Sequence, residues 1–135
     1  MKPKKDPVLM LAEYWLSAEY MRLLTHDLKE RWRESPETNW PKFRTYAAYW
    51  LSGLYVVAEG FKEWKLDREQ VTELTNEHLK RLKKFRNGTF HYQRSRRKQV
   101  QFFQQGREWQ ALDWAEQLHA QLGKALRDHA MAAAP

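Results

Sequence analysis

The stretch "FRTYAAYWLSGLYVVAEGFKEW", residues 43–64, has the clearest pattern in this chain. Its apolar side chains recur in alternating steps of four and three residues, which places them on one face of a helix. A stripe of this kind is typical of a helix that packs along another helix at a shallow angle. We therefore expect a helix that begins near Pro41 and buries its aromatic side chains in the core. The stripe consists of Phe43, Ala47, Trp50, Leu54, Val57, Phe61 and Trp64.

Two flanking segments carry the same helical period. The first runs from about Pro7 to Glu34, since Asp6 is a suitable N-cap and Pro7 suits the first helical position. Ser35 and Pro36 should end it. Its inner stripe is Leu11, Trp15, Ala18, Met21, Thr25, Leu28 and Trp32. The last helix runs from about Arg107 into the Ala-rich end, with a stripe of Leu112, Ala115, Leu118, Leu122 and Leu126.

A further helix is predicted to open at Asp67, because Gln70 three residues later completes a capping box. His78 lies on its stripe, and we expect it at the edge of the core rather than as a ligand. The stripe comprises Val71, Leu74, His78, Leu82 and Phe85, extended by Thr89 and Tyr92.

Four helices without a strand pattern predict an all-α fold, an up-down four-helix bundle. With 135 residues the chain is one domain long, 1–135. Within it we expect residues 1–6 to form a flexible basic lead. Residues 93–106 should form a basic loop, and residues 131–135 a frayed tail.

The chain has no cysteine, so disulfide and thiolate–zinc frameworks are excluded. It has no HExxH motif, its five histidines are scattered, and we expect neither a metal nor another cofactor. The longest apolar runs are shorter than 18 residues, so no membrane span is expected. The basic start lacks the apolar stretch and cleavage site of a signal peptide. These features together predict a cytoplasmic protein.

The positive charge is concentrated in one part of the chain. Residues 80–107 contain ten of the 24 Lys and Arg residues and no Asp or Glu, whereas the rest carries 17 acidic residues. A concentrated positive field favours a polyanionic partner such as RNA, DNA or an acidic protein. A solvated basic face is the simpler alternative.

The basic window contains "FRNGTFHYQ", residues 85–93, which places Arg86 and His91 five positions apart. On a helix these side chains would lie about 140° apart, to either side of the apolar stripe. They could converge if the helix loosens at Gly88 and Thr89, or if a second copy of the chain completes the site.

Arginine and histidine together suit phosphodiester cleavage. Histidine moves protons near neutral pH, and arginine holds phosphate oxygens. Asn87 could orient either group or contact the phosphate. RNA supplies its own 2′-hydroxyl nucleophile, so such a site needs no metal. One Arg and one His at this spacing also occur often by chance.

The sequence "RNGTFH", residues 86–91, resembles the Arg-x4-His motif of the HEPN superfamily, in which Asn commonly follows the Arg. The preceding segments "WLSGLYVVAEGFKEWKL", residues 50–66, and "LKRLKKFRNGTFHYQ", residues 79–93, are also similar to HEPN helices. The likeness covers roughly residues 50–93.

This resemblance implies a two-fold homodimer whose motifs face each other, and a metal-independent endoribonuclease in a toxin, antiphage or RNA-processing system. It assigns catalysis to Arg86 and His91, with Asn87 in support. Glu59 is a candidate polar partner from the preceding helix, although a solvent-facing role fits it equally well. We expect RNA to be steered by Lys83, Lys84, Arg94, Arg96 and Arg97.

Some HEPN toxins carry a tyrosine two positions after the histidine, which a partner nucleotidyltransferase modifies. Gln93 stands there in this chain, and Tyr92 is adjacent to the histidine instead. This departure argues against regulation by tyrosine modification, and we expect Tyr92 to pack at the end of its helix instead. An antitoxin or a nucleotidyltransferase stays a possible partner protein. The alternatives to an enzyme are a non-catalytic module that binds RNA or protein through the same face, and a plain helical scaffold.

Overall fold

A computed structural model describes residues 6–31, 36–66, 69–90 and 112–133. These residues form four helices and no strand: α1 (Pro7–Arg31), α2 (Pro36–Glu63), α3 (Asn76–Phe90) and α6 (Asp113–Ala133). The predicted all-α class is thus confirmed for the described part of the chain. None of the helices is long and apolar enough to cross a membrane.

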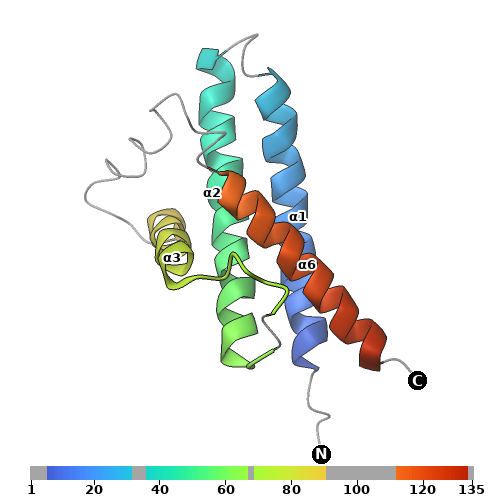
Figure 1. Cartoon of the computed structure of the whole chain (residues 1–135). Coiled ribbons are helices and arrows are strands. Elements are labelled where there is room, and N and C mark those ends of the chain that lie inside the picture. The colour runs from blue at the N-terminus through green and yellow to red at the C-terminus, as the bar shows by residue number, and fades with distance from the viewer. Residues whose placement is uncertain (1–5, 32–35, 67–68, 91–111, 134–135) are drawn as a thin grey trace, which may run out of the picture.

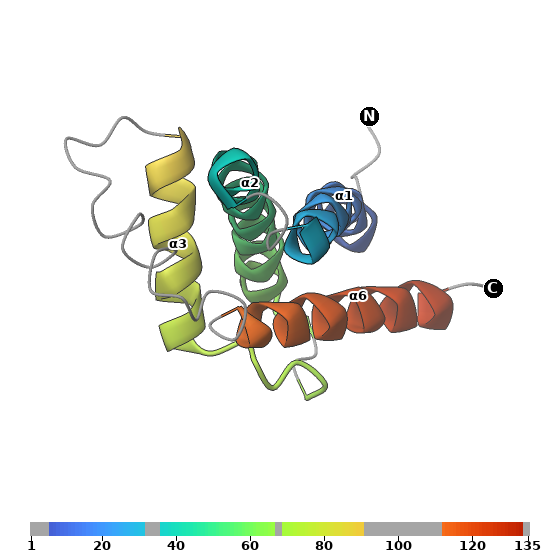
Figure 2. The ribbon, with the colours of Figure 1, turned by 90° about the horizontal axis from the view of Figure 1, so that it is seen from above.

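Helices α1 and α2 lie side by side and run in opposite directions (Figure 1). Helix α6 crosses this pair obliquely, and α3 lies on the other side of α2 from α1, as the view from above shows (Figure 2). The up-down arrangement therefore holds for α1 and α2 only. Helix α3 is 15 residues long and buries Leu82 and Phe85, with Leu79 partly buried beside them.

The predicted stripe of α2 forms the centre of the core. Six of its seven side chains are buried, and Trp50 is only 1% exposed. Trp64 is the exception, at 54% exposed, because α2 ends at Glu63. Lys65 has a left-handed φ of 54°, and the Leu66 N–H donates to the Phe61 carbonyl at 3.2 Å. This C-terminal cap turns the chain away from the helix axis.

Two helix starts differ from their predicted positions. Helix α2 begins at Pro36, a residue type suited to the first helical position, and continues through Pro41, the predicted start. Helix α3 begins at Asn76 rather than Asp67, because the Thr75 hydroxyl accepts the His78 N–H at 3.1 Å and so caps the helix. Val71, which precedes this cap, is nevertheless buried as expected.

The stripes of α1 and α6 pack as the sequence predicts. All five predicted residues of the last helix are buried, and so are Leu11, Ala18, Thr25 and Leu28 of α1. The two helices come close at Gly123, where a Cβ atom would overlap the Trp15 ring. The small residue lets the Trp15 indole N–H reach the His119 carbonyl, at 2.8 Å.

Candidate functional site

Arg86 lies near the end of α3 and is half-buried against α2. Its guanidinium carbon is 4.7 Å from the centre of the Tyr55 ring, within the range of a cation–π contact. Its Nη2 atom donates to the Asn87 side-chain oxygen at 3.0 Å. Two of the three predicted catalytic residues are therefore in direct contact, on a surface that α2 helps to build.

Tyr55 connects Arg86 to Glu59. Its ring is buried, and its hydroxyl donates a hydrogen bond to the Glu59 carboxylate one turn further along α2. This hydrogen bond, together with burial, raises the pKa of Tyr55, although the positive charge of Arg86 opposes the shift. Glu59 itself is exposed. The expected partner thus lies next to the arginine, with the tyrosine between them.

A groove of about 260 Å³ lies between α2 and α3 beside this group. Lys62 enters it from α2, and Lys80 and Lys83 enter it from α3. Among the described residues none of the three lysines has a carboxylate within ion-pair distance, and the Lys62 ammonium lies 3.4 Å from the neutral side chain of Asn76. Three lysines against the single carboxylate of Glu59 give the described wall of the groove a net positive charge, which favours an anionic ligand. The groove is completed by Tyr55, Glu59 and Leu79.

Of the remaining predicted site residues, the structure describes Lys84 only. Lys84 is exposed on α3 but does not line the groove. Helix α3 continues through Gly88 and Thr89 to Phe90. The loosening at Gly88 and Thr89, one of the two predicted ways to bring Arg86 and His91 together, is therefore not observed. The other positions lie outside the described residues: His91, Tyr92, Gln93, Arg94, Arg96 and Arg97.

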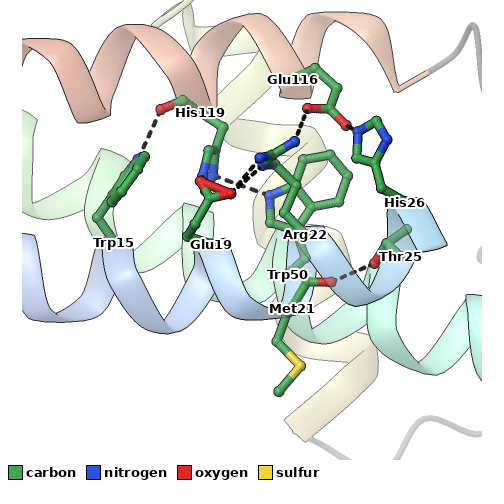
Figure 3. A network of polar contacts seen from close by, with 9 residues as sticks. All are labelled: Trp15, Glu19, Met21, Arg22, Thr25, His26, Trp50, Glu116 and His119. Carbon is green, nitrogen blue, oxygen red and sulfur yellow. Dashed lines mark hydrogen bonds and ion pairs between the residues drawn. The ribbon is translucent and has the colours of Figure 1, made fainter.

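A second cluster of charged side chains joins α1 to α6 (Figure 3). Arg22 of α1 donates from Nε to Glu19 at 2.9 Å and from Nη1 to Glu116 of α6 at 3.3 Å. His26, one turn beyond Arg22, contacts the other oxygen of Glu116. Glu19 in turn binds His119 of α6, whose Nε2 is 2.9 Å from the carboxylate. We call these five residues the α1–α6 network.

His119 is the most deeply buried member of the network, at 2% exposed. Its Nδ1 faces the indole N–H of Trp50 at 3.2 Å, and because an indole can only donate, Nδ1 accepts. The proton of the neutral ring is therefore on Nε2, where it donates to Glu19. Burial lowers the pKa of His119 and outweighs the opposing effect of Glu19.

Glu19 is charged in the same arrangement. Burial alone would raise the pKa of this carboxyl, but hydrogen bonds from Arg22 and His119, with the Arg22 charge, lower it. The neighbouring Glu19 likewise raises the pKa of Arg22 against the effect of burial. The network is thus a chain of matched partners that holds α6 against α1.

A cavity of about 310 Å³ adjoins the network, with Arg22, His26 and Glu116 on its wall. Each of these side chains already has a partner in the network. The described stretches of the chain contain no group of three or more His, Asp or Glu side chains placed to hold a metal ion. Asp113, exposed at the start of α6, also lines the cavity and has no ion pair among the described residues. The unpaired charge of the cavity is therefore negative, whereas that of the groove is positive.

Sequence reasoning missed the α1–α6 network, Tyr55 and Lys62. One signal was present: Glu19 and Arg22, and Glu116 and His119, each stand three residues apart and so share a helix face. Their partners are about 90 to 100 residues away in the chain, which local spacing does not reveal.

No protein-family model, curated protein or solved structure matches this chain.

Proposed function

We propose that this chain is a metal-independent endoribonuclease of HEPN type that acts as a homodimer. The placement of Arg86 supports the proposal most directly. Its guanidinium is half-buried, held by Tyr55 and Asn87, and lies beside a groove lined by three lysines that form no ion pair with a described carboxylate. An arginine in this position can bind one phosphate of an RNA chain that the lysines attract.

In the proposed reaction the 2′-hydroxyl of a ribose attacks the adjacent phosphorus, and the bond to the 5′-oxygen breaks. His91 takes the proton from the 2′-hydroxyl. Once protonated, the same His91 gives a proton to the leaving 5′-oxygen. Arg86 stabilises the charge on the phosphate oxygens, and Asn87 orients the guanidinium. The products are a 2′,3′-cyclic phosphate and a 5′-hydroxyl.

The main test is RNA cleavage in EDTA, with identification of the product ends. We expect the parent to leave cyclic phosphates, and the variants Arg86→Ala and His91→Ala to lose cleavage while remaining folded. Lys124→Ala is a suitable control, because Lys124 lies on α6 and pairs with Asp128. If both motif variants cut as fast as the parent, the proposal is wrong.

A mixing experiment tests the composite site. If Arg86 of one copy works with His91 of the other, a dimer of one Arg86→Ala chain and one His91→Ala chain keeps one intact site. Mixing the two inactive variants should then restore part of the activity. Sites formed within single chains would each retain one defect, and mixing would restore nothing.

The second candidate function is a non-catalytic module that binds RNA. The groove favours it, because Lys62, Lys80 and Lys83 do not depend on the His91 position. Such a protein would retard RNA in a gel in a salt-sensitive way without cutting it.

The ribonuclease proposal also includes a place in a toxin or antiphage pair, with an antitoxin or nucleotidyltransferase as partner. Copurification with the products of neighbouring reading frames would test it.

A further inference from the structure

The groove between α2 and α3 has a charge arrangement that the motif alone does not explain. Lys80 and Lys83 stand three residues apart on α3, and Arg86 follows after three more. Side chains at this spacing are neighbours on a helix, about 5–6 Å apart at their Cβ atoms. The three cations therefore form a slanting row that leads from the groove to Arg86.

Lys62 closes the groove from the opposite side. It belongs to the last turn of α2, so its charge and those of Lys80 and Lys83 come from two different helices. Glu59 is the single acidic residue on the described wall, and it accepts the Tyr55 hydroxyl. The groove thus has a net positive charge from groups that lie apart in sequence.

Some exposed cations of the described chain are paired, whereas Lys42, Lys65 and Arg127 have no ion pair among the described residues but do not line the groove. The groove differs from both kinds because three lysines from two helices line one hollow. Arg81, also on α3, pairs with Glu77 at 2.8 Å, and Lys124 lies 3.7 Å from Asp128. The groove lysines lack such carboxylate partners among the described residues. A bound phosphate would provide the missing counter-charge.

Tyr55 links the groove to the proposed catalytic arginine. It lines the groove, and its ring supports the Arg86 guanidinium. A phosphate in the groove and a phosphate at Arg86 would therefore both lie close to this one aromatic side chain. At about 260 Å³ the groove is smaller than the roughly 300–1,000 Å³ of sites that enclose drug-sized ligands. It suits the phosphate and sugar of one nucleotide.

We propose that Lys62, Lys80 and Lys83 form a subsite for the RNA phosphate adjoining the one that is cut. This inference rests on the proposed function for the identity of the scissile phosphate, but binding can be measured without cleavage. A subsite of this kind uses the contact with a non-reacting phosphate to place the reacting one. It would make the enzyme prefer substrates longer than a dinucleotide.

The first experiment measures binding of a short 2′-O-methylated RNA, which lacks the nucleophile, between about 50 and 200 mM salt. We expect Lys62→Ala and Lys80→Ala each to weaken binding several-fold and to reduce the slope of log K against log salt by roughly 0.7. Lys124→Ala removes an equal charge from α6 and should leave both quantities near the parental values. Lys62→Glu should weaken binding more than Lys62→Ala.

Three results would overturn the subsite. The groove variants could match Lys124→Ala in affinity and slope, or the parent protein could fail to bind the RNA. An acidic peptide could also bind in a lysine-dependent way where the RNA does not, which would assign the groove to a protein partner. Circular dichroism and urea unfolding of each variant separate these outcomes from loss of the fold.

The second experiment compares cleavage of a longer RNA with cleavage of a dinucleotide. Lys62→Ala should lower kcat/KM for the longer RNA and leave the dinucleotide unaffected, since the dinucleotide has no phosphate to place in the groove. Equal losses on both substrates would contradict the subsite while leaving the ribonuclease intact. RNA binding that depends on Lys62 without any cleavage would contradict the ribonuclease and leave the phosphate groove intact.

Discussion

The α1–α6 network and the α2–α3 groove both gather charged side chains, yet their charges are balanced differently. In the network Arg22 lies between Glu19 and Glu116, and each histidine has a carboxylate partner. In the groove three lysines accompany one glutamate without forming an ion pair with it, and the glutamate carboxylate accepts the Tyr55 hydroxyl. Partly buried charges must be paired in the folded chain itself, whereas exposed charges can stay unpaired until a ligand arrives. Pairing therefore distinguishes the cluster that holds helices together from the cluster open to a ligand.

The largest expected difference concerns the two arginines of these regions. Arg86→Lys keeps the charge but removes the planar fork, and we expect cleavage to fall about 100- to 1,000-fold, as when one transition-state donor is lost. Arg22→Lys should instead lower the free energy of unfolding and leave kcat unchanged below the melting transition. Metal-free cleavage and urea unfolding of both variants measure the two effects. Comparable activity losses in the two variants would break the distinction.

The second prediction concerns the stability of the network. Glu19→Ala leaves Arg22 and His119 without their shared partner, and we expect a loss of about 2–4 kcal/mol in the free energy of unfolding. Asp128→Ala breaks an exposed pair on α6 and should change it by less than about 1 kcal/mol. Urea unfolding at neutral pH makes the comparison. Equal values for the two variants would mean that the network is as weak as a surface ion pair.

The apolar stripes of α1, α2 and α6 were predictable, because local periodicity alone identifies the buried face of a helix. The start of α3 was not. Asp67 and Thr75 are both good capping residues, and only the folded chain shows that the Thr75 hydroxyl receives the N–H. The end of α2 was also hidden, since a lysine at positive φ stands where glycine is usual.

The candidate site shows the same limit of local patterns. The helical period correctly placed Arg86 off the apolar stripe, and Glu59 was already a candidate polar partner from the preceding helix. Tyr55, which joins them, has no local pattern that marks it. Its role depends on how α3 crosses α2, and short-range spacing does not determine that crossing.

The third prediction concerns pH and affects the network alone. His119 has a lowered pKa in the fold, so the unfolded chain takes up a proton that the folded chain does not. The contribution of neutral His119 to the free energy of unfolding is therefore fully present above the ordinary histidine pKa of about 6.5, and it decreases as the pH falls below that value. Glu19, whose pKa is also lowered, adds a further loss below about pH 4.5 as the pH falls through its folded value.

Urea unfolding between about pH 7.5 and 5 measures this slope, and His119→Gln should reduce it. The groove lies between α2 and α3, and none of the five residues of the α1–α6 network lines it. Binding of the methylated RNA should therefore keep its dependence on Lys62 over the same range. A slope that His119→Gln leaves unchanged would place the titrating group elsewhere.

The smallest expected effects separate the two contacts of Tyr55. Tyr55→Phe removes the hydrogen bond to Glu59 but keeps the ring under Arg86, so cleavage should stay near the parental rate. Tyr55→Leu removes the ring, and with it a cation–π contact of about 0.5–1 kcal/mol, which corresponds to a two- to fivefold lower kcat. Affinity for the methylated RNA should change less than kcat, since the lysines remain. If Tyr55→Phe lowers kcat as much as Tyr55→Leu, the hydrogen bond from the Tyr55 hydroxyl to Glu59 positions Arg86. Glu59 would then affect catalysis through Tyr55.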